Sequence, residues 1–257
     1  IYTAFGPHSP YTVSDDPLKK LAVLAEELDV PIHMHVHETT EEVTEAVAKN
    51  GQRPLHRLKE LGLISPRLLC VHATQLLDEE IRVLAELGAS VIHCPESNLK
   101  LASGFCETAK LLSHSVNLAL GTDGGASNND LDMFSEMRTA ALVAKAIAGD
   151  ARSLPAHQIL EIATINGAKA LGIEQKIGSL EVGKYADITA VNLNNFNTLP
   201  THNPLSHLVY AAKSSQVSHV WCGGRAILHN GALKTIDEGL LRSETQTWQE
   251  RILAMGR

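Results

Sequence analysis

The segment Pro31-Ile-His-Met-His-Val-His-Glu38 gives the clearest sign of the fold. Its apolar residues Ile32, Met34 and Val36 alternate with histidines over the length of a β-strand. A stretch before it, Ser14 to Leu28, repeats leucine at helical spacing behind an acidic, proline-containing start, and another helical stretch begins after it at Thr40. The segment is therefore one strand of a repeated βα unit, and such units predict a parallel sheet.

The same alternation extends from residue 1 to about residue 125. The predicted strands are Ile1–Gly6, Val30–Val36, Arg67–Val71, Ala89–His93 and Val116–Leu120. Beyond the helix after Ser14, the predicted helices are Thr40–Lys49, Asp78–Leu87, Asp130–Ala148, and one or two shorter helices within Pro155–Leu171. This order predicts an α/β fold of the barrel type.

A histidine or an aspartate ends or follows each predicted strand. These residues are His8, His35, His72, His93 and Asp123. One histidine at a strand end is usually a hydrogen-bonded structural residue, but the carboxyl ends of parallel barrel strands meet at one mouth, where active sites are built. Imidazole and carboxylate are also the ligands that zinc takes in catalytic sites. The series therefore favours a shared site.

Two questions stay open within the histidine segment. His33, His35 and His37 share one face of a strand by the period of two, so either H-x-H pair fits a metal motif. Glu38 follows His35 by three residues, where a carboxylate can move a proton of a bound water. Its alternative role is to stabilise the N-terminus of the helix at Thr40.

The composition describes an ordinary globular protein. The chain has 257 residues, of which 44% are hydrophobic and 20% charged, and its net charge is −7. Lysine and arginine are scattered, which disfavours nucleic-acid binding and favours a small-molecule partner. The four cysteines lack C-x-x-C spacing, so we expect neither a disulfide framework nor a thiolate zinc site, and we expect a cytoplasmic location.

The sequence shows neither a membrane-spanning pattern nor a signal-peptide pattern. No apolar run reaches the ~18–20 residues that span a bilayer, so we expect no membrane insertion. The first residues read as a strand without a signal-peptide pattern, and we expect the chain to begin inside a domain.

The pattern changes near residue 175. Glycines then separate short β-rich runs such as Asp187–Val191 and Val217–Cys222, and an amphipathic stretch from Glu238 to Met255 follows. We therefore predict a barrel portion at residues 1–174, a portion of a small β-domain at residues 175–236, and a C-terminal helix at residues 237–257.

Several motifs together resemble those of one enzyme family. They are Gly6-Pro-His-Ser-Pro-Tyr-Thr-Val-Ser14, His33-Met-His-Val-His-Glu-Thr39, Val71-His-Ala-Thr-Gln75, His93-Cys-Pro-Glu-Ser-Asn-Leu-Lys-Leu101 and Gly121-Thr-Asp-Gly-Gly-Ala-Ser-Asn-Asn129. The set resembles the 5-methylthioadenosine/S-adenosylhomocysteine deaminases of the amidohydrolase superfamily, whose branch includes triazine chlorohydrolases and guanine-type deaminases. Gly178-Ser-Leu-Glu-Val-Gly-Lys-Tyr-Ala-Asp187 is similar to the return into the family's composite β-sandwich. The resemblance implies the later strands of a (β/α)8 TIM-like barrel and the C-terminal portion of that sandwich.

The resemblance also implies roles for single residues. His35 would be a metal ligand, and Asp123 would be a ligand, a substrate contact and a proton carrier. Glu38 would bind the substrate and protonate its ring nitrogen, while His72 would orient the attacking water and help to deprotonate it. His8 matches a substrate-contacting position. One divalent ion is implied, Zn²⁺ in the first place and Fe²⁺ as the alternative.

The stretch that includes His93, Ser97 and Asn98 matches a loop near the family's site. The family's other two metal ligands form an H-x-H at the end of the first barrel strand, which we expect upstream of Ile1. Neither H-x-H pair of the segment above replaces it, because that segment matches the fifth strand.

The implied function is hydrolytic deamination of an adenosine derivative by a homo-oligomeric enzyme. Two alternatives are the same barrel acting on another ring, as a guanine-type deaminase or a triazine chlorohydrolase, and a catalytically silent scaffold. Retention of His35, Glu38, His72 and Asp123 together argues against the scaffold. The other zinc deaminase class needs P-C-x-x-C, which this sequence lacks.

Overall fold

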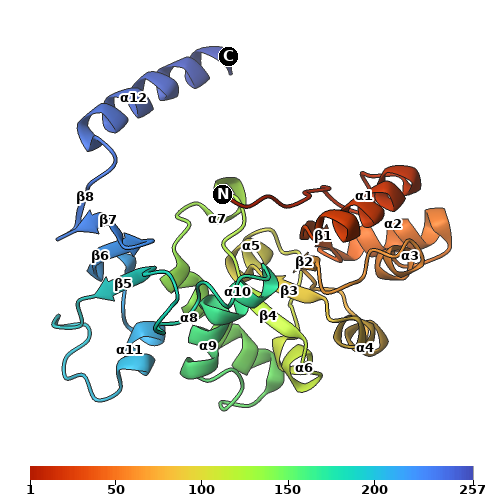
Figure 1. The fold of residues 1–257 in the computed structure, drawn as a ribbon, viewed down its shortest axis with the longest axis horizontal. Coiled ribbons are helices and arrows are strands. Elements are labelled where there is room, and N and C mark those ends of the chain that lie inside the picture. Colours follow the sequence, from red (N-terminus) through yellow and green to blue (C-terminus); the bar gives the residue numbers. More distant parts are fainter. Residues whose placement is uncertain (257) are drawn as a thin grey trace.

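The structure, a computed structural model, describes residues 1–256. Two four-stranded sheets organise it (Figure 1). The parallel sheet has the order β1-β2-β3-β4, with strands Ile32–Val36, Leu68–His72, Ser90–His93 and Asn117–Leu120. The antiparallel sheet has the order β5-β6-β7-β8, with strands Ile188–Val191, Val217–Cys222, Arg225–His229 and Ala232–Leu233. The α/β class and the parallel sheet are confirmed.

Helices precede, connect and follow the strands of the parallel sheet. They are α1 (Asp15–Leu28), α2 (Thr40–Asn50), α3 (Pro54–Glu60), α4 (Asp78–Leu87), α5 (Pro95–Lys100), α6 (Thr108–Ser113), α7 (Gly125–Asn128), α8 (Met133–Ala148), α9 (Ala156–Ala163) and α10 (Ile165–Ala170). The antiparallel sheet is accompanied by α11 (Pro204–Tyr210), the 3₁₀ turn η1 (Ser214–Gln216) and α12 (Glu238–Met255). No helix of residues 1–256 is long and apolar enough to cross a membrane.

The two faces of the parallel sheet are packed differently. Alternate strand residues such as Met34, Cys70 and Leu118 are buried in one core with residues of the helices. The opposite face carries a small cluster that includes Leu69 and Ala119. Because His33 is paired with Leu69 in register, His33 and His35 lie on this second face.

The predicted first strand is wrong. Residues Ile1–Gly6 form a single β-bridge, between Phe5 and Ile32, in place of a strand. The backbone hydrogen bonds of this bridge run from Phe5 N to Pro31 O and from His33 N to Phe5 O, at 2.8 Å each. The residues before Phe5 are exposed, and within residues 1–256 no strand pairs with them.

One predicted helix start is confirmed and one needs correction. Ser14 is the N-cap of α1, as predicted, although its side chain makes no capping hydrogen bond within residues 1–256. The helix predicted from Asp130 begins at Met133, because Asp132 takes the N-cap position and accepts a hydrogen bond from the amide of Phe134 at 2.8 Å. The short helices α3, α5, α6, α7 and α11 were not predicted.

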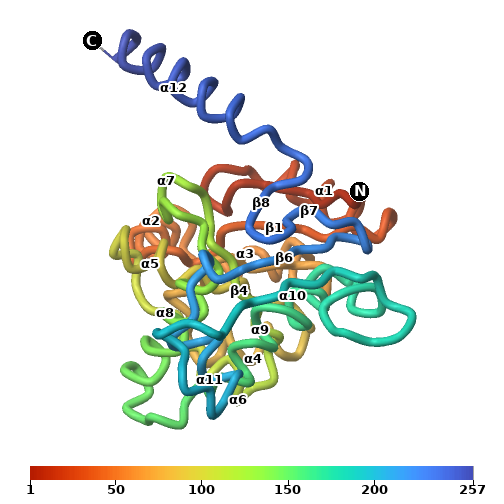
Figure 2. Tube along the Cα trace, turned by 90° about the vertical axis from the view of Figure 1, so that its left-hand side faces the viewer, coloured from red at the N-terminus to blue at the C-terminus, as the bar shows by residue number. Residues whose placement is uncertain are grey.

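The chain passes closely against α10 before it enters the second sheet. Gly178 has φ of 92°, and a Cβ atom there would lie 2.8 Å from the Cβ of Ala168 and 2.9 Å from the Cα of Ile165. At the far end, α12 projects away from the rest of the molecule and is exposed along its length (Figures 1 and 2). The division at residues 174 and 236 stays a prediction.

Candidate active site

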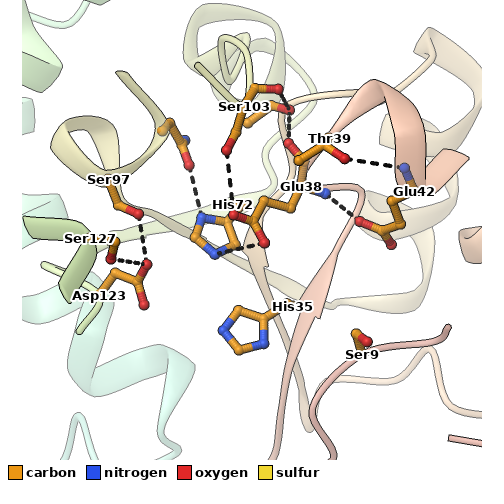
Figure 3. A network of polar contacts seen from close by, with 12 residues as sticks. Ser9, His35, Glu38, Thr39, Glu42, His72, Ser97, Ser103, Asp123 and Ser127 are labelled. Atoms are coloured by element: carbon orange, nitrogen blue, oxygen red, sulfur yellow. Dashed lines mark hydrogen bonds and ion pairs between the residues drawn. The ribbon is translucent and has the colours of Figure 1, made fainter. Parts of the chain in front are cut away.

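Three of the predicted residues come together at the carboxyl edge of the parallel sheet. One potential ligand atom each from His35, His72 and Asp123 lies within 4.8 Å of the other two. His35 comes from β1, His72 from the end of β2, and Asp123 from the loop after β4 (Figure 3). The rings of His35 and His72 are stacked, with centroids 5.3 Å apart. The ring of His8 lies 5.0 Å from that of His35.

Left-handed backbone conformations redirect the side chains at this edge. His72 has φ of 73° and Asp123 has φ of 64°. His72 is paired in register with Val36, a residue of the helix-covered core, so regular strand geometry would direct its ring into that core. Non-glycine residues in this conformation cost about 1–3 kcal/mol each, and such strain concentrates at functional sites.

The tautomer of His35 follows from its partner. His35 Nδ1 lies 2.6 Å from the carbonyl oxygen of His8. A carbonyl oxygen can only accept, so Nδ1 carries the proton and donates it. The lone pair of Nε2 is then free for a metal ion, as in metal sites where a carbonyl orients the ligating histidine.

Two serines hold one oxygen of Asp123. Ser97 Oγ and Ser127 Oγ both donate to Asp123 Oδ2 at 2.7 Å (Figure 3). Burial alone would raise the pKa of Asp123, but these bonds and the amide of Gly124 lower it below the usual value. The carboxylate is thus kept ionised, and the serines leave Oδ1 for other partners.

Thr39 and Glu42 make the hydrogen bonds at the start of α2. Thr39 is the N-cap and accepts from the amide of Glu42 at 3.1 Å. The carboxylate of Glu42 accepts from the amides of His37 and Glu38, at 3.1 and 2.7 Å. Thr39 and Glu42 thus make the hydrogen bonds at this turn, and the carboxylate of Glu38 makes none of them.

The side chain of Glu38 turns instead toward the cluster (Figure 3). Its Oε2 lies 3.7 Å from His72 Nε2, and the side chain is 22% exposed. Its Oε1 accepts one long hydrogen bond, of 3.4 Å, from Ser103 Oγ. Thr74 Oγ1 donates to the backbone carbonyl of Glu38 at 2.6 Å. The backbone of Glu38 is thus held at its N–H by Glu42 and at its carbonyl by Thr74, while its carboxyl group keeps most of its hydrogen-bonding capacity.

Of the three histidines in the β1 segment, His35 alone joins the cluster. His37 follows the last strand residue, has φ of 55° and is buried. Its Nε2 accepts from the amide of Leu55 at 3.1 Å, and burial lowers its pKa to about 4 despite the nearby Glu80. Neither H-x-H pair therefore acts as a unit within residues 1–256.

Residues 1–227 match the family model described as Amidohydrolase family. The chain belongs to this family. A 5-methylthioadenosine/S-adenosylhomocysteine deaminase from Teredinibacter turnerae is 50% identical over 248 residues, which are 96% of this chain and 56% of that relative. This amidohydrolase chain thus spans just over half the length of the curated relatives that it matches.

Solved structures agree with this placement. A crystal structure of an adenosine deaminase from Xanthomonas campestris with bound zinc is 54% identical, with a TM-score of 0.97, and the match covers 98% of this chain and 57% of that one. An atrazine chlorohydrolase variant from Arthrobacter aurescens, complexed with zinc and atraton, is 25% identical, with a TM-score of 0.90 over 95% of this chain and 54% of that one. The predicted family and barrel-type fold of this amidohydrolase are confirmed.

The donor set of this amidohydrolase fits a divalent metal ion. Two imidazoles and a carboxylate within 4.8 Å approach the roughly 3–4 Å between ligand atoms that share one ion at ~2.0–2.2 Å. Hydrogen bonds occupy His35 Nδ1 and Asp123 Oδ2, so His35 Nε2 and Asp123 Oδ1 are the atoms left to bind an ion. His72 is the third donor of the set, although the family resemblance gives it a proton-transfer role.

Some residues of the site escaped prediction from sequence. Ser127 and Ser97 lie inside motifs that were recognised, but their contact with Asp123 was not foreseen. Ser103 gave no signal in the sequence, whereas Glu42 could have been found from the Thr39-x-x-Glu42 spacing, which is typical of a helix capping box. His93 ends β3, as predicted, and is buried. Burial and His72 lower its pKa to about 3, and its Nδ1 has no hydrogen-bond partner within residues 1–256. Its role near the site stays a prediction.

Proposed function

We propose that the whole protein containing this chain is a metal-dependent hydrolytic deaminase. Its substrates would be 5′-methylthioadenosine, S-adenosylhomocysteine or both, and its products the inosine analogue and ammonia. One observation carries the proposal: a cluster of metal-type donors, His35, His72 and Asp123, lies beside the carboxyl group of Glu38, 3.7 Å from His72 Nε2. A carboxyl group beside a metal-type donor cluster supports the proposal.

His35 Nε2 and Asp123 Oδ1 would hold the ion. Zn²⁺ suits this nitrogen and oxygen donor set, and Fe²⁺ is the alternative. A bound divalent ion would lower the pKa of a water molecule toward ~7 and so make hydroxide available at neutral pH.

The protein's own groups would move the protons. His72 Nε2 and Asp123 take one proton from the attacking water as its oxygen adds to C6 of the adenine ring. Glu38 gives a proton to the ring nitrogen beside C6. The exocyclic amino group then receives the proton taken from the water and leaves as ammonia with the electrons of the C6–N bond. The hydroxyl on C6 gives its remaining proton back to Glu38 and becomes a carbonyl. Atoms and charges balance with water as the only co-substrate.

His8 would contact the substrate. Its ring is exposed beside the cluster, 5.0 Å from the ring of His35 and 5.9 Å from that of Tyr11. Its Nδ1 lies 3.0 Å from the hydroxyl of the buried Ser9, which limits rotation of the ring. The side chain is therefore oriented before a ligand arrives.

Substrate preference provides the test. Purified whole protein, loaded with zinc, is assayed for ammonia release from 5′-methylthioadenosine, S-adenosylhomocysteine and guanine, and for chloride release from a chlorotriazine. We expect the two adenosine derivatives to react fastest, since the deaminase relative is 50% identical and the triazine hydrolase 25%. Comparable turnover of guanine or of the chlorotriazine would favour a guanine-type deaminase or a triazine chlorohydrolase. No turnover of any of the four compounds would favour a catalytically silent scaffold.

The remaining expectations rest on the sequence and stay predictions. They are a cytoplasmic location, a homo-oligomeric state, a small-molecule nucleoside partner, and no binding to nucleic acid or membrane.

A further inference from the structure

Two adjacent residues of α5 reach two different members of the cluster. Ser97 Oγ donates to Asp123 Oδ2 at 2.7 Å, and Asn98 Oδ1 lies 2.8 Å from His72 Nδ1. Ser97 is 0% and Asn98 2% exposed, and His72 is 1% exposed. Water therefore does not compete for the contact between Asn98 and His72, which constrains the ring strongly, whereas the contact between Ser97 and Asp123 is part-buried.

The contact to His72 determines which ring nitrogen carries the proton. An amide oxygen can only accept a hydrogen bond, so His72 Nδ1 must be the donor. The lone pair then lies on Nε2, the nitrogen that is 3.7 Å from Glu38 Oε2. The neutral imidazole of free histidine prefers the proton on Nε2, so the contact reverses the intrinsic preference of the ring.

We propose that Asn98 is a positioning residue that holds neutral His72 in the Nδ1-protonated form, so that Nε2 can accept a proton from the attacking water. This inference rests on the proposed function, because it gives His72 the role of base. Rotation of the Asn98 amide by 180° would place its NH₂ group against Nδ1, move the proton to Nε2 and remove the acceptor. The two arrangements predict opposite tautomers.

The surroundings hold Asn98 in place. Its backbone N–H donates to the backbone carbonyl of Cys94 at 3.0 Å, and its backbone carbonyl accepts from the backbone N–H of Ser103 at 2.9 Å. The start of α5 is attached to α8, because the amide of Glu96 donates to Glu136 Oε2 at 3.3 Å. The backbone that carries Asn98 is thus anchored at several points.

The side-chain NH₂ group of Asn98 does not explain why an asparagine occupies this position. Its Nδ2 is buried and has no hydrogen-bond partner within residues 1–256. A buried donor without a partner costs free energy, and an apolar residue of similar size would avoid that cost. The contact that the side chain does make is the one to His72, which points to His72 as the reason for the residue.

The tautomer is measured directly by ¹⁵N NMR on zinc-loaded whole protein labelled at histidine, at about pH 8, where an ordinary histidine is neutral. The His72 signals are assigned by their loss in His72→Gln. Two-bond couplings from the ring protons identify the protonated nitrogen. We expect Nδ1–H in the wild-type protein, and an Nε2–H form would overturn the proposal.

Two substitutions of Asn98 by residues of nearly equal size distinguish loss of the hydrogen-bond acceptor from a change in packing. Asn98→Asp keeps an acceptor oxygen and should keep the Nδ1–H form. Asn98→Leu removes it and should populate Nε2–H, with kcat lowered about 10–100-fold, as for lost partners of other oriented histidines, and KM changed by less than about threefold. Asn117→Leu is the matched control, since Asn117 lies on β4 and bonds Ser90 Oγ and Asn166 O, away from the cluster.

The outcomes separate this inference from the proposed function. An Nδ1–H signal that Asn98→Leu shifts supports the role of Asn98 even if no adenosine derivative is deaminated, in which case the proposed function alone fails. Deamination by a protein whose His72 is Nε2–H, or an Asn98→Leu variant with unchanged tautomer and kcat, refutes the inference alone. If Asn98→Leu does not fold, the wild-type and Asn98→Asp spectra decide.

Discussion

Replacement of Glu38 by glutamine separates a chemical role from a structural one. The two side chains have nearly the same shape, and the amide cannot give up a proton as a carboxylic acid can. Glu38 is partly exposed, and its carboxylate accepts one hydrogen bond, the 3.4 Å contact from Ser103. The segment is held through its backbone by Glu42 and Thr74, which the substitution leaves intact.

The two possible contributions differ greatly in size. If Glu38 stabilised the N-terminus of α2 through the helix dipole, its loss would cost ~0.3–1 kcal/mol of folding free energy. General acid–base transfer contributes ~10²–10⁴-fold to the rate, which corresponds to about 2.7–5.5 kcal/mol of activation free energy. Glu42 already accepts hydrogen bonds from the backbone amides of His37 and Glu38. We therefore expect Glu38→Gln to lower the free energy of unfolding by about 0.3 kcal/mol or less.

The assay compares kcat for ammonia release with bound metal and thermal stability in the whole protein. We expect kcat to fall at least about 100-fold while metal content stays near one ion per chain. Glu41→Gln is the matched control, because Glu41 is an exposed carboxylate in the first turn of α2 and its loss removes the same charge. A Glu38→Gln protein that keeps its metal and more than about a tenth of its turnover would refute the proton-transfer role.

Two further predictions concern the metal and the pH dependence of stability. His35→Ala should lose both the bound ion and turnover, whereas His33→Ala should keep the ion, and elemental analysis showing the reverse would reassign the ligand. Burial raises the pKa of Glu136 from 4.5 to about 8, against hydrogen bonds from Glu96 N and Asn128, so the folded protein holds a proton that the unfolded chain releases. The free energy of unfolding should therefore fall as pH rises from about 4.5 to about 8, and denaturant titrations of Glu136→Gln should show a weaker fall across that window.

The strands of the parallel sheet could be predicted because local composition determines them. Short apolar runs such as 68–72 and 117–120 are flanked by helical periodicity on both sides, and both became strands within about a residue of their predicted bounds. Ile1–Gly6 has the same local composition, but the strand predicted there does not form. A strand needs a neighbouring strand along its length, and within residues 1–256 this segment pairs at Phe5 alone.

Contacts between distant parts of the chain could not be predicted. Ser97 and Asn98 lie on α5, a helix of six residues that is too short to show a periodicity. Each reaches a partner 26 positions away, Asp123 in one case and His72 in the other. The motif with Cys94 and Pro95 marked the stretch as belonging near the site. The assignment of each side chain to its partner required the packing of α5 against the sheet.

The end of β1 shows why periodicity located the site without resolving it. The period of two holds as far as Val36, the last residue of the strand, and places His35 at the mouth. One residue later the backbone of His37 turns to φ of 55°, which moves that ring beneath the helices, where it accepts from the amide of Leu55. The same turn brings Glu38 toward His72, where regular continuation of the strand would have carried it onward along the sheet. The break in the pattern that makes His37 structural is therefore also what makes Glu38 available for chemistry.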